Sequence, residues 1–313
     1  MTEKRYSHIS ITPNFYQLGT PSFPAYLSLG DDGMIIEGGT GATFAIIIDQ
    51  LKELGIEPER IKYLFLTHTH TDHIGAIPRL RRIWPHLKIV ASPVGEKLLT
   101  RLVTKHEALK EFITTDRDIA EIMLSKGEID AVPPELDSYT FGVDMVVKEG
   151  DRLNLGSGVL WTVYDTPGHS PCHISLHNEK EGTLVIGDAT GFYAPDKDIF
   201  WPNYFNSLEA YCTSIRKLAS LPAQRGVLSH NGVIEGGVKR YFQKALKATE
   251  SYHREMIARL DKGEDPDEIA LEKARWVITF TALIPFEGIK ALAALLVRRS
   301  QSAVVSEGLL AIP

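Results

Sequence analysis

The stretch LFLTHTHTDHIG, residues 64 to 75, places three histidines and one aspartate within six positions, directly after an apolar run. His68 and His70 are separated by one residue, so an extended chain directs both imidazoles to the same side. Asp72 and His73 follow where the chain is expected to turn into a helix. A bend that is so rich in imidazole and carboxylate groups predicts a metal site at the end of a buried strand.

Short apolar runs with β-branched residues and turn residues at their ends predict four buried strands. They cover residues 61–67, 159–166, 183–187 and 225–229. Each run is followed at once by a side chain that can bind a metal, and these are His68, His169, Asp188 and His230. Side chains that leave the ends of several strands at one edge of a sheet can converge despite their distance in sequence.

Helical patterns lie between and after these strands. Residues 207–221 start at Ser207, a candidate N-cap, and stop before Pro222. This alternation predicts an α/β layered fold, with a helical insertion over about residues 92–140. We expect one domain over residues 1–236 and a helical extension over 237–313, broken at residues 263–268 and packed on the substrate pocket.

The candidate ligands divide between two ions. His68, His70 and His169 are expected to hold the first ion, and Asp72, His73 and His230 the second. Asp188 has two carboxylate oxygens and can bridge both ions, which imidazole cannot do. The residues therefore predict two divalent metal ions, with Zn²⁺ as the first candidate and Fe or Mn as alternatives.

These residues resemble the metallo-β-lactamase-fold hydrolases, whose HxHxDH pattern is matched by residues 68–73. The distal histidine is matched in TPGH, the bridging aspartate in IGD and the last histidine in SHNG. The resemblance implies a four-layer αββα sandwich with the metals at one edge between the sheets. Glu37, in MIIEGGT, stands where many members have Asp, and is expected to orient a ligand histidine.

Within this family, the segments IEGG, GHSPCH and GDA look most like the 2-aminobenzoylacetyl-CoA thioesterases of quinolone signalling. His173 lies in the second of these segments. For His173, a contact with a metal ligand and simple packing against a strand are both open. Cys172 beside it is interpreted as a small buried thiol.

The expected activity is hydrolysis by a hydroxide that bridges the two metal ions and attacks a carbonyl, with Asp72 holding and passing on a proton. Lactonases of this family often carry Tyr three residues after the bridging aspartate, but Gly191 stands there and Tyr193 is interpreted as a wall of the substrate pocket. An acyl thioester is therefore the first substrate class. The alternatives are a lactone, a carboxylic or phosphate ester, and a regulatory partner-binding protein with a vestigial metal site.

Net charge and composition restrict the classes of partner and the compartment that we expect for this chain. A net charge of −6 gives no reason to expect nucleic acid. The N-terminus lacks an apolar signal segment and the chain has two cysteines, which indicates the cytoplasm.

Residues 276–297 contain Pro and charged positions and are interpreted as two buried segments, not a membrane span. A homodimer is the candidate assembly, and the oligomeric state stays open. The remaining histidines are expected at the surface, namely His8, His86, His106, His177 and His253.

Overall fold

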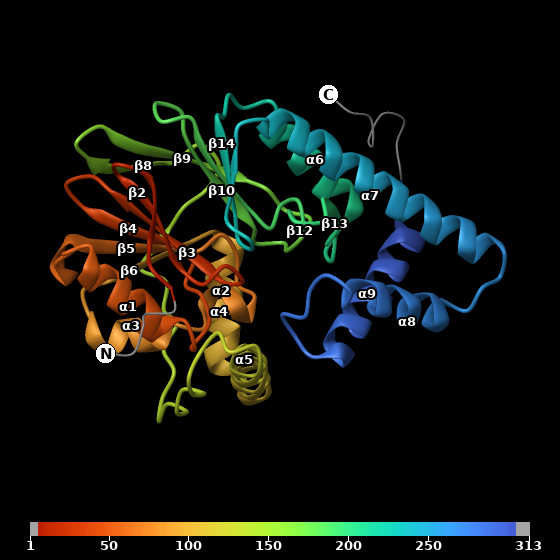
Figure 1. The fold of residues 1–313 in the computed structure, drawn as a ribbon, viewed down its shortest axis with the longest axis horizontal. Coiled ribbons are helices and arrows are strands. Elements are labelled where there is room, and N and C mark those ends of the chain that lie inside the picture. The colour runs from red at the N-terminus through yellow and green to blue at the C-terminus, as the bar shows by residue number, and fades with distance from the viewer. Residues whose placement is uncertain (1–5, 305–313) are drawn as a thin grey trace. The chain divides into compact units, whose positions relative to one another are not determined.

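The computed structural model describes residues 6–304. Cα packing divides the chain into two compact units, Met1–Tyr164 and Asp165–Pro313. Figure 1 draws both units and labels most of their helices and strands.

The first unit is built on a seven-stranded sheet in the order β1-β2-β3-β4-β5-β6-β7. β1 to β4 pair antiparallel, whereas β4 to β7 pair parallel. The apolar run predicted as a strand at residues 61–67 is confirmed as β5. The strands are β1 (Ile9–Thr12), β2 (Phe15–Gly19), β3 (Pro24–Leu29), β4 (Gly33–Ile36), β5 (Ile61–Phe65), β6 (Lys88–Ala91) and β7 (Met145–Val146). β8 (Arg152–Gly156) pairs antiparallel with β9 (Val159–Asp165), which confirms the strand expected at 159–166.

Helices of the first unit share a hydrophobic core with this sheet. Ile47 of α1 (Phe44–Glu53) and Leu80 of α3 (Ile77–Ile83) belong to one buried cluster with Leu64 of β5. A short 3₁₀ turn, η1 (Pro58–Arg60), precedes β5. The helical insertion expected over about residues 92–140 consists of α4 (Pro93–Thr104) and α5 (His106–Ser125), but residues 126–140 form turns and irregular chain, so its expected end was wrong. Ser92 caps α4, because its hydroxyl accepts a hydrogen bond from the Gly95 N–H at 3.1 Å.

In the second unit, four strands are hydrogen-bonded in the order β15-β14-β11-β10. β11 pairs antiparallel with β10 and parallel with β14. The runs predicted as strands at 183–187 and 225–229 are confirmed as β11 and β14. The bounds are β10 (Ile174–Asn178), β11 (Thr183–Gly187), β14 (Arg225–Leu228) and β15 (Val233–Glu235). A two-stranded hairpin of β12 (Phe192–Ala194) and β13 (Ile199–Trp201) lies between β11 and β14 in sequence.

The second unit also contains four helices within the described residues. The predicted cap of α6 (Leu208–Ala219) is confirmed, because the Ser207 hydroxyl accepts from the Ala210 N–H at 3.1 Å. The predicted helical C-terminal region consists of α7 (Val238–Asp261), α8 (Pro266–Val277) and α9 (Phe286–Ser302). Each of these helices contributes to one hydrophobic cluster, through Met256, Ile269 and Leu296 respectively. The cluster also contains Ile186 of β11.

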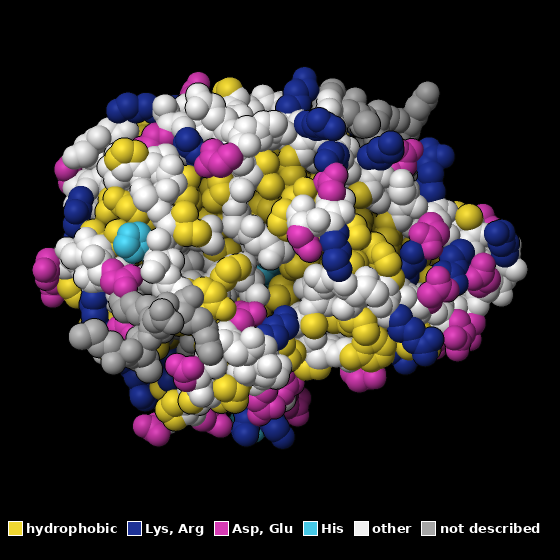
Figure 2. All heavy atoms as spheres, in the orientation of Figure 1, with side chains coloured by type: hydrophobic (Ala, Val, Ile, Leu, Met, Phe, Trp, Pro, Cys, Tyr) yellow, Lys and Arg dark blue, Asp and Glu magenta, His cyan; other side chains and the backbone are white. Residues whose placement is uncertain are grey.

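The surface of α7 and α8 carries charges of both signs, which intermix in Figure 2. Arg259 pairs with Glu264 at 2.7 Å and with Glu272 at 2.8 Å. The apolar stretch at residues 276–297 is divided between the end of α8, a loop and α9. Among residues 6–304, no helix combines the length and the apolar character that a membrane crossing needs.

Candidate metal centre

Three histidines of the first unit lie together just beyond the end of β5. His68 Nε2 is 3.0 Å from His70 Nδ1, and the ring centroids of His68 and His73 are 4.0 Å apart. His68 and His73 are only 1% and 2% exposed. Ring nitrogens this close to one another must either share a proton or face a common cation. The cluster is therefore suited to binding a positive ion.

Asp72 adds a carboxylate to this cluster from the short helix α2 (Thr71–Ile74). Its Oδ2 lies 3.4 Å from His73 Nε2, and its side chain is 19% exposed. The chain leaves β5 in an extended conformation and enters α2 at this point. Because of that turn, Asp72 and His73 are adjacent in sequence yet both face the same nitrogen-rich cluster.

Buried hydrogen bonds determine which nitrogens of two histidines carry protons. Thr67 donates its hydroxyl to Glu37 Oε1 at 2.6 Å, so the Thr67 hydroxyl oxygen must accept from His68 Nδ1, 3.0 Å away. The other carboxylate oxygen, Glu37 Oε2, lies 3.1 Å from His73 Nδ1. With both Nδ1 atoms acting as donors, neutral His68 and His73 present the Nε2 lone pair, which is the form that binds metal.

Glu37 reaches this position through an uncommon backbone conformation. Its φ is +73°, and the residue is 2% exposed. A non-glycine residue with positive φ has a conformational cost of about 1–2 kcal/mol. The two hydrogen bonds of the Glu37 carboxylate offset this cost. They connect Glu37 to Thr67 and His73, at the two ends of the segment that carries the candidate ligands.

In the second unit, Asp188 faces two histidines. Its Oδ2 lies 3.5 Å from His169 Nε2 and 3.7 Å from His230 Nε2. His169 Nδ1 donates to the carbonyl oxygen of Asn203 at 3.0 Å, so neutral His169 directs a lone pair at the carboxylate. Asp188 follows β11 directly, and His230 comes two residues after β14. Acceptor atoms that face one another in this way suit a cation or a proton between them.

His173 holds the main chain at Asp188. The Asp188 N–H donates to His173 Nε2 at 3.0 Å, and His173 Nδ1 lies 2.8 Å from the Thr166 hydroxyl. Since Nε2 accepts, the proton of the neutral ring is on Nδ1. The residue therefore touches the backbone of the carboxylate that carries the site, and it does not only fill space against β10.

Tyr193 belongs to β12 and its ring packs between aromatic side chains. The ring centroids of Phe200 and Tyr241 lie 4.4 Å and 5.3 Å away. Its hydroxyl donates to Asp198 at 2.9 Å. Burial, together with the Asp198 carboxylate, raises the pKa of Tyr193 to about 12. Its proton is consequently held firmly at neutral pH.

The predicted site residues thus fall into two groups, each close-packed within its own unit. Sequence reasoning missed three residues that orient them, namely Thr67, Thr166 and Asn203. Thr67 directly precedes the HxHxDH motif, and Thr166 lies three residues before His169, so adjacency could have indicated both. Asn203 acts through its backbone carbonyl, which has no sequence signal.

Two histidines that were expected at the surface are buried, so these predictions were wrong. His177 is 4% exposed and donates Nε2–H to the Pro222 carbonyl at 2.8 Å. It lies in β10, whose five residues are all buried. His253 is 7% exposed in α7, and burial lowers its pKa. In both cases tertiary packing covers a polar position that the local pattern suggested would be solvated.

Asp116 of α5 touches the loop that follows Glu37. Its Oδ1 accepts from the Gly41 N–H at 2.8 Å. Burial raises the pKa of Asp116 from 3.8 to about 6, although the Gly41 hydrogen bond and Arg79 act in the opposite direction and Asp72 adds to the rise. The native state therefore binds this proton more tightly than the unfolded chain does.

Asp116→Asn should change how stability depends on pH. Between pH 7.5 and 4.5 the native wild-type protein takes up a proton at Asp116 that the unfolded chain takes up only nearer pH 4, so this group adds stability as the pH falls. The variant should lose this gain, which is about 1–3 kcal/mol. Urea unfolding at both pH values, in the presence of a chelator, measures it. Asp118→Asn is the control, and an equal pH response in all three proteins would contradict the prediction.

Comparison with known proteins identifies the family. Residues 24–230 match the model of the metallo-beta-lactamase superfamily, so the chain belongs to this superfamily. A metallo-beta-lactamase family protein of Thermus thermophilus has the same fold, with a TM-score of 0.63 at 22% identity. The match covers 93% of this chain and 94% of that protein. The predicted metallo-β-lactamase fold class, with its helical C-terminal region, is confirmed.

Sequence relatives place the chain among the metallo-hydrolases. It is 26% identical to the probable metallo-hydrolase YflN of Bacillus subtilis over 69% of this chain and 80% of YflN. It is 34% identical to a hydroxyacylglutathione hydrolase of Polaromonas sp. over 31% of this chain and 36% of that enzyme. The relatives are chemically diverse, because flavo-diiron and diflavin proteins match as well. With its clustered histidines and aspartates, the chain has the donor set for divalent metal ions.

Proposed function

We propose that this chain is a metal-dependent hydrolase that cleaves acyl thioesters. The observation that carries the proposal is the arrangement at Asp188, whose carboxylate faces the Nε2 atoms of His169 and His230 at 3.5 Å and 3.7 Å. We further propose that seven side chains together hold two divalent ions. These are His68, His70, Asp72, His73, His169, Asp188 and His230.

The donor chemistry fits such ions. Three of the histidines have their Nδ1 proton engaged by a hydrogen-bond acceptor, which leaves Nε2 free of a proton when the ring is neutral. Imidazole nitrogen and carboxylate oxygen suit Zn²⁺, and also Fe or Mn. Bound divalent ions would polarise an acyl carbonyl and make bound water more acidic.

The chain's own carboxylates would divide the remaining work. Glu37 is 2% exposed and already engaged by Thr67 and His73, so its part is to orient. Asp72 has a 19% exposed side chain and can exchange a proton with solvent. We therefore assign Asp72 the role of taking a proton from the attacking water and passing it on.

The chemistry of the leaving group favours a thioester as the substrate. A thiolate with a pKa of about 8.5 departs without a general acid, whereas an alkoxide needs one. Gly191, three residues after Asp188, has a φ of +73°, and a Cβ there would lie 2.5 Å from the Trp201 carbonyl oxygen. Packing therefore leaves no room at this position for a tyrosine that could act as a general acid. Hydroxyacylglutathione, the substrate named for one relative, is itself a thioester.

A substrate panel tests the proposal. Protein loaded separately with Zn²⁺, Fe²⁺ and Mn²⁺ would be given acyl-CoA and acylglutathione thioesters, with detection of the released thiol. Lactones, carboxylic esters and phosphate esters form the second half of the panel. We expect thioesters to have the highest kcat/KM. Turnover confined to lactones or oxygen esters would replace the thioesterase proposal, and metal binding without any turnover would remove the hydrolase proposal.

Glu37→Gln should weaken metal binding. The glutamine side chain is neutral and has one acceptor oxygen where the carboxylate has two. It therefore cannot accept from both Thr67 and the Nδ1–H of His73 as Glu37 does, and the His73 ring loses its orientation. Loss of such a supporting hydrogen bond typically lowers metal affinity about 10–100-fold. Competition with a chromogenic chelator measures the affinity. Glu59→Gln, at an exposed position of η1, is the matched control, and equal affinities of the two variants would contradict the role of Glu37.

A further inference from the structure

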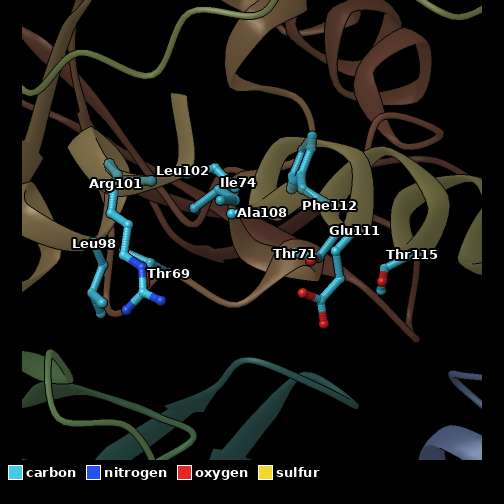
Figure 3. Close-up of a pocket in the computed structure, with 11 residues that line it drawn as sticks. Thr69, Thr71, Ile74, Leu98, Arg101, Leu102, Ala108, Glu111, Phe112 and Thr115 are labelled. Atoms are coloured by element: carbon cyan, nitrogen blue, oxygen red, sulfur yellow. The ribbon is translucent and has the colours of Figure 1, made fainter. Parts of the chain in front are cut away.

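A cavity of about 330 Å³ opens in the first unit between α2, α4 and α5. This volume is at the lower end of the range for small-molecule sites. Thr69 and Thr71 form one wall, and they alternate along the chain with the candidate ligands His68, His70 and Asp72. Figure 3 shows this wall together with side chains from α4 and α5. Two threonines of the metal motif therefore border the cavity, although none of the candidate ligands is among its lining residues.

The deepest lining residues are apolar. Ile74, Leu99 and Phe112 are 1%, 2% and 3% exposed, and all three line the cavity. The Phe112 ring is held edge-on against Phe141, with ring centroids 4.9 Å apart. A floor of this composition offers no hydrogen-bonding group to a ligand, and its aromatic wall is fixed by packing. It suits a hydrocarbon group and disfavours a charged one.

The charged side chains of the lining are exposed to solvent, and Thr69, Thr71 and Thr115 supply the rest of its polar side chains. The charged side chains are Arg101 and Glu111. In Figure 3 the guanidinium of Arg101 and the carboxylate of Glu111 both point away from Ile74 and Phe112. A ligand with an apolar body and a polar end would therefore have its body inward and its polar end near these charges.

We propose that this cavity receives the acyl group of the substrate, and that the acyl group is an uncharged, apolar chain. The identity of the ligand rests on the proposed thioester hydrolysis. Leu98 of α4 and Ala108 of α5 both line the cavity, so the bulk of these two side chains limits the room for an acyl chain. Each buried methylene group contributes about 0.8 kcal/mol, so kcat/KM should depend strongly on the length of the acyl chain.

Two substitutions should change the preferred chain length in opposite directions. Ala108→Leu adds bulk, so kcat/KM for the longest well-cleaved acyl thioester should fall about tenfold or more, whereas that for the acetyl thioester should change less than about twofold. Leu98→Ala removes bulk and should shift the preference to longer chains. Thr114→Leu, at an exposed position of α5 that does not line the cavity, is the matched control and should leave the preference unchanged.

Direct binding separates this inference from the proposed function. Titration calorimetry would follow medium-chain fatty carboxylates, the expected products, binding to the metal-free protein. Ala108→Leu should weaken this binding about tenfold or more, and Thr114→Leu should not. No binding to wild type, or equal binding by both variants, would overturn the assignment. Binding that depends on Ala108 without hydrolysis of any thioester would keep the cavity and overturn the hydrolase proposal.

Discussion

Asp188→Asn is expected to lower thioester hydrolysis by about 10³-fold or more, because metal ions contribute several kcal/mol of charge stabilisation in such sites. Asp188 Oδ2 faces the Nε2 atoms of His169 and His230 at 3.5 Å and 3.7 Å. At the proposed two-metal site, an amide would have no negative charge to offset the repulsion between the cations. Its NH₂ group would also be a donor where a metal ligand is needed. The variant should therefore lose metal as well as activity.

Elemental analysis of the purified variant and kcat/KM on the best thioester measure the two effects separately. Asp196→Asn is the control, since Asp196 is exposed on the turn between β12 and β13. A variant with full metal content and wild-type kcat/KM would show that Asp188 has no part in the chemistry. A variant that keeps its cellular role after losing hydrolysis would instead favour the regulatory, partner-binding alternative.

Gly168→Ala is expected to lower stability by about 3 kcal/mol or more and to disturb His169. Gly168 has a φ of +135°, and a Cβ there would lie 2.2 Å from the Tyr211 Cα. Its carbonyl accepts from the N–H groups of Asn206 and Ser207 at 3.0 Å and 3.2 Å, directly before α6. Backbone atoms cannot yield as a flexible side chain can, so either α6 or the loop that carries His169 must move.

Thermal unfolding should show this change as a melting temperature about 6–12 °C lower. Gly263→Ala is the matched control. Gly263 also has a positive φ, +79°, but a Cβ there would meet nothing within 4 Å. The control should cost only the backbone strain of about 1–2 kcal/mol. Equal shifts in both variants would mean that the contact with α6 is unimportant, and unchanged metal content in Gly168→Ala would mean that His169 keeps its position.

Several elements could be predicted because their signals are local. The apolar runs that became β5, β11 and β14 are bounded by turn residues, and the cap of α6 is a single serine beside the helix that it starts. The break between α7 and α8 follows from Gly and Pro within a few residues. The surface prediction for His177 and His253 failed because burial of a polar side chain depends on elements that pack from elsewhere in the chain.

The sequence alone determined which side chains can bind metal and that each follows a strand, since composition and short-range pattern carry this information. The tertiary structure decided how those side chains are oriented. Glu37 reaches His73 across 36 positions, and Asn203 reaches His169 across 34. Such contacts leave no periodic trace, because hydrogen-bond geometry depends on where the folded backbone brings distant residues together. For the same reason, the apolar floor beside the metal motif became visible only once α4 and α5 were in place.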